Sequence, residues 1–200
     1  GQTSISPSVS YGTPKIFSLS GIGSFQANGN GGELVIINGV NFGPPEIPEF
    51  FQGVTYGESG VEYKANCTHV SHTELHCITA PGIGNDLYWK VNVEGQTNIL
   101  DANAKSSYAA PWVLDFPTLV DTDLSTETPQ RITGTNLGVS DKLADIVLLQ
   151  YHSDSIVSLE IVSTSLLENG NHEVYFVVPH LECNTCTSTF KLVVLVKSPS

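Results

Sequence analysis

Three histidines and two cysteines lie close together in the sequence and offer the most obvious set of metal ligands. His69, His72 and His76 fall around Cys67 and Cys77, and imidazole combined with thiolate suits zinc or copper. A strand, however, points successive side chains to opposite faces, so His76 and Cys77 are not expected to reach one ion together. We therefore favour a hairpin with solvated histidines and a Cys67–Cys77 disulfide bond, and no metal site.

A group of acidic residues is the second set that can bind an ion. The carboxylates of Asp115, Asp121, Asp123 and Glu127 offer the oxygen ligands that Ca²⁺ prefers. Their spacing is not that of an EF-hand loop, and acidic loops are ordinary in a chain with 20 Asp and Glu residues. We expect no cofactor here and keep Ca²⁺ as the alternative.

Cys183 and Cys186 form a Cys-x-x-Cys motif, a spacing that redox enzymes use. A thioredoxin-like site also needs a helix directly after a strand, and no helical period follows this motif. The chain has four cysteines, an even number that favours disulfides over a structural zinc site with four ligands. We predict that Cys183 and Cys186 close a loop as a second disulfide.

No group of residues has the pattern of a catalytic site. The segment Gly29–Gly32 is rich in glycine, but it lacks the following helix that a phosphate-binding loop needs. No nucleophile with a neighbouring base can be named. We predict that the protein is not an enzyme. Trp89 and Trp112 are expected in a core or between domains, not as platforms for a bound ring.

Charge and composition exclude several classes of partner. Eight Lys and Arg against 20 Asp and Glu give a net charge of −12, so nucleic acid and anionic lipid repel the chain. No apolar run is long enough to insert into a bilayer, and the longest is Leu192–Val196. The sequon Asn66-Cys67-Thr68 predicts an N-linked glycan on Asn66, on the strand face opposite Cys67 and toward solvent. With the cysteines, it predicts an extracellular or cell-surface glycoprotein.

Strand-like segments fill the chain. Short β-branched or aromatic runs alternate with clusters of Gly, Pro, Asn and Ser, a pattern typical of antiparallel sheets. The first series of expected strands lies at 14–19, 33–38, 51–56, 61–68, 73–79 and 87–94. The second lies at 111–116, 130–134, 145–151, 156–163, 172–178 and 189–196. Short strands without a long helix between them predict an all-β fold of antiparallel sandwiches.

An internal repeat relates the two series of strands. Ser10–Pro14 recurs as Ser107–Pro111, an offset of 97 residues from Tyr11 to Tyr108. Other matches keep a similar spacing: Gly1–Ile5 with Gly95–Ile99, Gly39–Gly43 with Gly134–Gly138, and Trp89–Val91 with Phe190–Leu192. The repeating unit has the length of an immunoglobulin-like domain.

The motifs of the first repeat are Gly31-Gly32…Ile37-x-Gly39-x-Asn41-Phe42-Gly43, Val54-x-Tyr56-Gly57 and Cys67…Thr73-x-Leu75-x-Cys77-x-Thr79-x-Pro81-Gly82-x-Gly84. With them the repeat resembles an IPT/TIG domain, the immunoglobulin-like fold of plexins, related receptors and some transcription factors. The second repeat keeps Gly134-x-Asn136-x-Gly138 and Pro179 but has Tyr175 in place of Cys77, so its cysteine bridge is absent. The resemblance implies a binding or structural module, not an enzyme. The DNA-contacting members use basic loops that this chain lacks, so the extracellular branch fits better.

The repeat also sets the expected domain boundaries. Residues 1–11 are an N-terminal strand, 12–109 a first IPT/TIG-like domain, and 110–200 a second, divergent one. By the repeat, residues 1–11 match the final strand of a domain, and the second domain has no counterpart of 95–108. Two explanations stay open. The chain is a window of a longer IPT/TIG array, or residues 1–11 complete the second domain of a neighbouring copy by strand donation.

We therefore carry two hypotheses for the function. The first is a structural protein of an extracellular filament or surface appendage, a homopolymer assembled head-to-tail through residues 1–11. In that strand Ile5, Val9 and Tyr11 share one face, and Pro7 is tolerated at a sheet edge. The alternative is an adhesin or receptor ectodomain from a longer array, acting in cell adhesion by binding a protein or glycan ligand.

Overall fold

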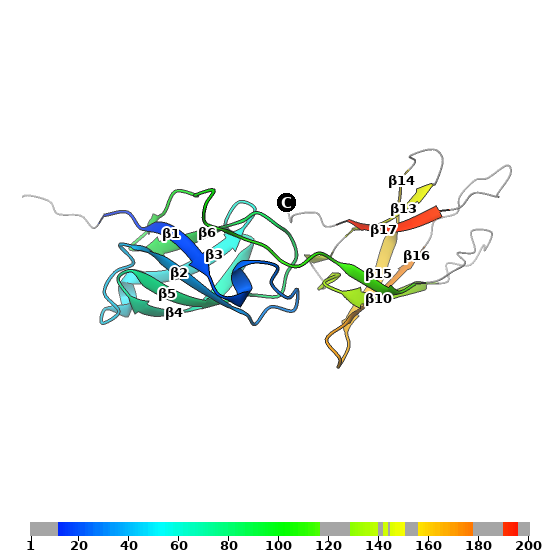
Figure 1. The fold of residues 1–200 in the computed structure, drawn as a ribbon, viewed down its shortest axis with the longest axis horizontal. Coiled ribbons are helices and arrows are strands. Elements are labelled where there is room, and N and C mark those ends of the chain that lie inside the picture. Colours follow the sequence, from blue (N-terminus) through cyan, green and yellow to red (C-terminus); the bar gives the residue numbers. More distant parts are fainter. Residues whose placement is uncertain are drawn as a thin grey trace, which may run out of the picture.

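The computed structural model describes residues 12–116, 129–139, 142–143, 145–150, 156–177 and 190–195 (Figure 1). These residues form strands and two short 3-10 helices, and the paired strands run antiparallel. The fold is therefore all-β, as the sequence predicts. Figure 1 shows two parts end to end, which we call the first half (residues 12–108) and the second half (the described residues from 109 to 195).

The strands of the first half pair in the order β1-β2-β5-β4-β3-β6-β7, with β8 also on β6. Strand β4 joins two layers, because Ala65 pairs with Val54 of β3 and Cys67 pairs with Cys77 of β5. The arrangement is consistent with a β-sandwich. The elements are β1 (Lys15–Ser20), η1 (Ile22–Ser24), β2 (Leu34–Val40), η2 (Pro48–Phe50), β3 (Phe51–Gly57), β4 (Tyr63–Ser71), β5 (Glu74–Ile78), β6 (Leu87–Val93), β7 (Gln96–Thr97) and β8 (Lys105–Ser106).

Alternating side chains from both layers build the core of the first half. Every second residue of β2 and β6 is buried, which is the period of a strand with one covered face. Trp89 is buried as expected, and its ring stacks on Tyr56 with 4.3 Å between ring centroids. Burial of each such large apolar side chain contributes about 1.5–3 kcal/mol to folding. Further members of this core are Val35, Ile37, Phe42, Val54, Leu75, Leu87 and Val91.

Two glycines of the repeated motif are required by local geometry. A Cβ on Gly39 would overlap the carbonyl oxygen of Lys15, so only glycine lets β1 and β2 approach this closely. Gly43 has a φ of 87°, a left-handed conformation that is unstrained in glycine alone. The close approach of β1 and β2 therefore depends on Gly39, and the turn after β2 depends on Gly43.

The second half contains a four-stranded sheet in the order β15-β16-β10-β9, a three-stranded sheet β14-β13-β17 and the pair β11-β12. Its core consists of Ile132, Leu137, Leu159, Val174 and Phe176. The elements are β9 (Trp112–Asp115), β10 (Gln130–Thr135), β11 (Gly138–Val139), β12 (Lys142–Leu143), β13 (Asp145–Gln150), β14 (Ile156–Ser158), β15 (Glu160–Leu166), β16 (His172–Val177) and β17 (Phe190–Leu195).

Strand register corrects one detail of the repeat. Ile37 pairs with Leu75, and its repeat equivalent Ile132 pairs with Val174. Two residues further along, Phe176 therefore takes the place of Cys77, and the match to Tyr175 was wrong by one residue. A one-residue shift moves a side chain to the other face, and Tyr175 is indeed less buried than Phe176.

An apolar pair takes the place of the disulfide in the second half. Ile161 of β15 lies opposite Phe176 of β16, just as Cys67 lies opposite Cys77 in the first half. Ile161 packs against the core that contains Phe176. The second half therefore lacks the equivalent disulfide because a cysteine is replaced, as the sequence indicated, but the replacing residue is Phe176 and not Tyr175.

Trp112 is the second correction. It was expected in a core or between domains, but its side chain is 68% exposed. Strand β9 lies at the edge of its sheet, and alternation directs Val113 rather than Trp112 to the core. The sequence marked the strand correctly and left the choice of its buried face open.

Candidate functional site

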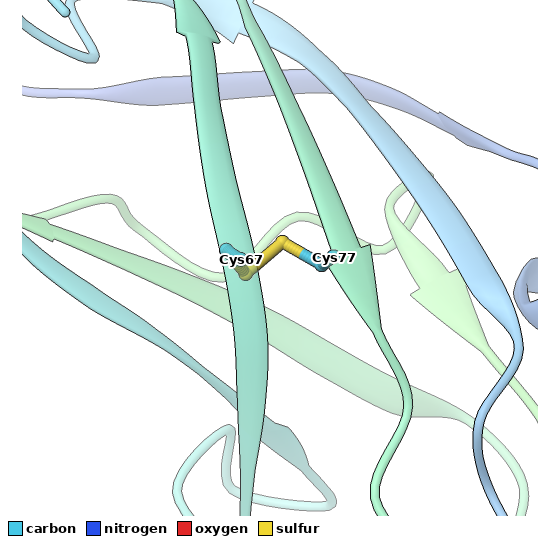
Figure 2. The surroundings of a disulfide bond; sticks show 2 residues. All are labelled: Cys67 and Cys77. Carbon is cyan, nitrogen blue, oxygen red and sulfur yellow. A yellow bond between two sulfur atoms is a disulfide. The ribbon is translucent and has the colours of Figure 1, made fainter.

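The structure separates the candidate metal ligands. Cys67 of β4 and Cys77 of β5 form a disulfide across adjacent strands (Figure 2), so neither sulfur is a free thiolate. His76 Nε2 lies 2.7 Å from Glu74 Oε1, while the ring of His69 lies 5.2 Å from the ring of Phe51. Within the described part of the chain, no three His, Cys, Asp or Glu side chains gather as ligands would. That the protein has no metal cofactor stays a prediction.

The disulfide gives a direct prediction about stability. The double variant Cys67→Ala/Cys77→Ala is expected to unfold with a free energy about 2–3 kcal/mol below that of the wild type, because the unfolded chain loses a short closed loop. Chemical denaturation of the wild type with and without reductant measures the same loss. The double variant serves as the control for any effect of reductant on other cysteines. Equal denaturation midpoints for the wild type and the double variant would contradict the prediction.

The acidic group is described only at Asp115, since Asp121, Asp123 and Glu127 lie outside the described residues. The carboxylate of Asp115 is 3.2 Å from Arg131 Nη2, and Arg131 Nη1 is 3.2 Å from Glu173. An arginine between two carboxylates supplies the positive charge that a cation would otherwise bring. Cys183 and Cys186 also lie outside the described residues, so their disulfide stays a prediction.

The sequon lies on an accessible part of β4. Asn66 and Thr68 are exposed, whereas Cys67 between them is partly buried. Alternation along β4 therefore directs Asn66 to solvent, as the sequence analysis expects. Attachment of a glycan to Asn66 stays a prediction.

The final segment of the first half closes its core. Trp89 Nε1 donates a hydrogen bond to Ser106 Oγ at 2.9 Å. Tyr108 donates through its hydroxyl to the carbonyl oxygen of Ala80 at 2.5 Å, which leaves Tyr56 to donate to the Tyr108 oxygen at 2.5 Å. The backbone N–H of Ala80 donates to Tyr56 at 2.8 Å and completes the ring of bonds. Burial raises the pKa of Tyr56 to about 12 and raises the pKa of Tyr108 above its usual range, so both hydroxyls keep their protons at neutral pH.

The same segment also covers the outer edge of β6. Strand β7 pairs with one end of β6 and β8 with the other. Between β7 and β8, the side chain of Asn98 bonds the backbone of β6. Its Oδ1 accepts from the Val91 N–H at 2.7 Å, and its Nδ2 donates to the Trp89 carbonyl at 3.0 Å. The backbone of β6 is therefore paired on both sides.

Strand β17 is the repeat equivalent of β6, and its outer edge is the candidate functional site. Tyr56 pairs with Trp89 in the first half, and Gln150 pairs with Phe190 in the second, which agrees with the sequence match of Trp89 to Phe190. Among the described residues, β17 pairs with β13 alone. A row of unpaired N–H and C=O groups at a sheet edge binds another strand readily.

The predicted assembly residues Ile5, Val9 and Tyr11 lie outside the described residues, but their repeat equivalents are described. Val9 corresponds to Ser106 and Tyr11 to Tyr108, and both equivalents are buried. Ile5 corresponds to Ile99, which is 89% exposed. The equivalents of Val9 and Tyr11 therefore lie in the core and that of Ile5 lies at the surface, while the roles of Ile5, Val9 and Tyr11 themselves stay predictions.

A second set of residues, which the sequence analysis missed, joins the two halves. The N–H of Gly29 donates to Asn136 Oδ1 at 2.9 Å, and Asn30 Nδ2 donates to the carbonyl oxygen of Gly170 at 3.0 Å. His172 Nε2 lies 2.7 Å from Asn30 Oδ1. We call these five residues the joint. One hint was present in the sequence, because Asn136 belongs to the repeated Gly-x-Asn-x-Gly motif.

The hydrogen bonds of His172 fix its tautomer. The N–H of Leu137 donates to Nδ1 at 3.0 Å, so Nδ1 carries a lone pair and the proton is on Nε2, which donates to Asn30. The residue is only 2% exposed, and burial lowers the pKa of His172. A neutral imidazole therefore holds the two halves together at neutral pH.

Comparison with models of protein families and with curated proteins found no match for this chain. The IPT/TIG pattern accordingly stays a resemblance. The disulfide is typical of an oxidising compartment. Among the described elements, none is a helix long and apolar enough to cross a bilayer.

Proposed function

We propose that the protein is a structural component of an extracellular filament or surface appendage. Its two tandem domains, residues 12–109 and 110–200, are immunoglobulin-like and of IPT/TIG type. Copies assemble head-to-tail when residues 1–11 of one copy pair with the outer edge of β17 of the next. The observation that carries this proposal is the difference between β6, which is paired on both edges, and β17, which is paired on one among the described residues.

The first half supplies the template for the donated strand. Thr97 and Gln96 pair with Asn92 and Val93 of β6. By the repeat, Thr3 of the donor then lies opposite Val193 of β17, and Gln2 lies opposite Val194. Val9 and Tyr11 follow at the places where Ser106 and Tyr108 enter the core of the first half. Main-chain hydrogen bonds supply the affinity of such a complex, and the inward side chains supply its specificity.

The geometry of the contact favours a filament. A donated strand joins two different surfaces of the same protein, and such a head-to-tail contact continues from copy to copy unless its rotation closes a ring. The disulfide and the exposed sequon at Asn66 support an extracellular location.

Deletion of residues 1–11 tests the proposal. The full chain is expected to form oligomers whose mass grows with concentration, whereas the deleted chain stays a monomer in sedimentation velocity. A synthetic peptide of residues 1–11 should bind the deleted chain with one peptide per chain. Oligomers of undiminished mass after the deletion would refute strand donation.

A matched pair of substitutions sharpens the test. Val9→Asp places a charge at the position whose equivalent, Ser106, is buried, and is expected to weaken assembly about 100-fold or more, since an unpaired buried charge costs several kcal/mol. Ser8→Asp adds the same charge at the position of Lys105, which points outward to Asp86, and should leave assembly nearly unchanged. Equal effects of the two variants would show that strand orientation plays no part.

One observation favours the alternative, an adhesin or receptor ectodomain that binds a protein or glycan ligand. A groove of about 440 Å³ lies between β1 and residues 99–102. Phe17 and Ile99, which line it, are 60% and 89% exposed, and exposed apolar grooves are common at binding sites. Phe17→Glu is expected to abolish cell binding under this alternative and to leave oligomer mass unchanged.

A further inference from the structure

We infer that Asn41 is a docking site for the sandwich that precedes the first half, and that successive copies stack through it as the two halves stack through Asn136. The preceding sandwich is the second half of a neighbouring copy. The inference therefore rests on the proposed function, and it adds a second contact to the donated strand.

Asn41 and Asn136 are equivalent in conformation as well as in sequence. Both have left-handed backbones, with φ of 64° and 55°, a conformation that asparagine tolerates better than most residues. Asn41 Nδ2 donates to the carbonyl oxygen of Thr13 at 3.0 Å, and Asn136 Nδ2 donates to that of Ala110 at 3.3 Å. Thr13 and Ala110 are themselves repeat equivalents. Each amide is thus held by the segment that enters its own half.

The two amides differ at their oxygens. Asn136 Oδ1 accepts the N–H of Gly29 across the joint. No described residue donates to Asn41 Oδ1, and among the described residues the Asn41 amide is oriented by its Nδ2 bond to the Thr13 carbonyl. An acceptor that is already fixed in position loses little conformational freedom on binding a donor. Asn41 Oδ1 is therefore available to accept a hydrogen bond from a donor in another sandwich, as Asn136 Oδ1 accepts from Gly29 in the joint.

The connecting segment has the right length for such a joint. Tyr108 is anchored in the core of the first half, and Pro111 follows three residues later at the start of the second. Tyr11 and Pro14 have the same separation. Suppose that Tyr11 is anchored in a neighbouring copy in the way that Tyr108 is anchored in the first half. The three-residue connection to Pro14 then brings Asn41 as close to that copy as Asn136 is to Gly29.

The donor that fits Asn41 is a backbone N–H of the preceding sandwich. A Cβ on Gly29 would lie 3.1 Å from Asn136 Oδ1. The same Cβ would lie 3.2 Å from Asn136 Cα and 3.3 Å from the Gly82 carbonyl oxygen, so a donor residue with a side chain is accommodated after the facing backbones separate by a few tenths of an ångström. The between-copy joint is expected to resemble the joint within the chain without matching it atom for atom.

A fused tandem of two copies tests the inference without requiring spontaneous assembly. The second copy follows Ser200 of the first, so its residues 1–11 are supplied where the first copy needs them. Spin labels at Ser163→Cys of the leading copy and Ser18→Cys of the following copy, both at exposed positions, report the distance across the between-copy joint. We expect a narrow distance distribution that becomes broad with Asn41→Gly in the following copy. Glycine suits the positive φ, so this variant removes the amide without backbone strain.

Two comparisons make the result specific. Asn41→Asp keeps an oxygen acceptor and is expected to retain a narrower distribution than Asn41→Gly. Labels at Ser18 and Ser163 within one copy should respond to Asn136→Gly and not to Asn41→Gly. The inference is wrong if the between-copy distribution of the wild-type tandem is the same as that of the Asn41→Gly tandem. If free copies fail to assemble while the tandem shows an Asn41-dependent joint, the proposed filament fails and the docking site stands.

Discussion

Replacing Tyr108 with alanine is expected to lower the free energy of unfolding of the first half by about 3–5 kcal/mol, the range for removal of a large buried aromatic side chain. Tyr108 is 5% exposed and packs against the rings of Tyr56 and Tyr63. Its hydroxyl links Tyr56 to the carbonyl of Ala80. The substitution therefore removes both a packed ring and the centre of a buried hydrogen-bond circuit.

Fluorescence of Trp89 measures this loss. The chain has two tryptophans, and Trp112 is exposed, so a Trp112→Phe background leaves the buried Trp89 as the reporter of the first half. Tyr108→Phe is the matched control. It keeps the ring, removes the hydroxyl and is expected to cost about 1–3 kcal/mol. An alanine variant as stable as the phenylalanine variant would show that the ring contributes little.

The result also bears on assembly, because Tyr11 is the repeat equivalent of Tyr108. If the final strand contributes most of its energy through this one tyrosine, a donated strand has an anchor of the same kind. A concentrated contribution of this size is typical of aromatic anchors at protein interfaces. The loss measured for Tyr108→Ala is therefore the contribution that we expect of Tyr11 under the proposed strand donation.

The positions of the strands along the chain could be predicted from the sequence because they depend on local patterns. Alternation of buried residues in β2 and β6 and the turn glycine Gly43 after β2 mark strands and their ends without reference to distant residues. The disulfide between Cys67 and Cys77 was predictable for a similar reason, since a hairpin brings its two strands together.

Contacts between distant residues could not be predicted in the same way. Asn30 and His172 are separated by 142 positions, and the pattern around each is that of an ordinary polar turn. Trp112 shows a related limit, because an edge strand can direct either face outward and its sequence alone does not decide which. The match of Tyr175 to Cys77 was wrong because residue counting cannot locate a one-residue shift in register.

The joint is expected to weaken in mild acid, because a neutral His172 is part of its geometry. A proton added at Nδ1 would face the Leu137 N–H, which now donates to that atom, and leave this buried donor without an acceptor. Loss of such a partner costs about 1–3 kcal/mol. Leu137 and His172 both belong to the second half, but Leu137 directly follows Asn136, whose Oδ1 accepts the N–H of Gly29 across the joint. Displacement of the Leu137 backbone is therefore expected to loosen the joint before either half unfolds.

The direction of the pH effect follows from burial. The pKa of His172 is lowered in the folded protein, so the unfolded chain binds more protons in the range below the ordinary value of 6.5. The stabilising contribution is complete above pH 6.5 and is lost as the pH falls through the lower, folded pKa. The nearby carboxylates do not oppose the lowered pKa of His172, because each has another partner. Glu173 pairs with Arg131, and Glu33 accepts the N–H of Asn28.

Spin labels at Ser18 and Ser163 of a single chain measure the loosening as a broader distance distribution between pH 7.5 and pH 4.5. The control is His172→Gln, whose neutral amide does not titrate. The two proteins differ at residue 172 alone, so the difference between their pH profiles belongs to His172. A separate readout is the ring proton resonance of His172, which should titrate below pH 6.5. Because the predicted loosening requires protonation of Nδ1 at a lowered pKa, it would be refuted by a His172 that titrates at or above pH 6.5, or by a wild-type profile identical to that of the glutamine variant.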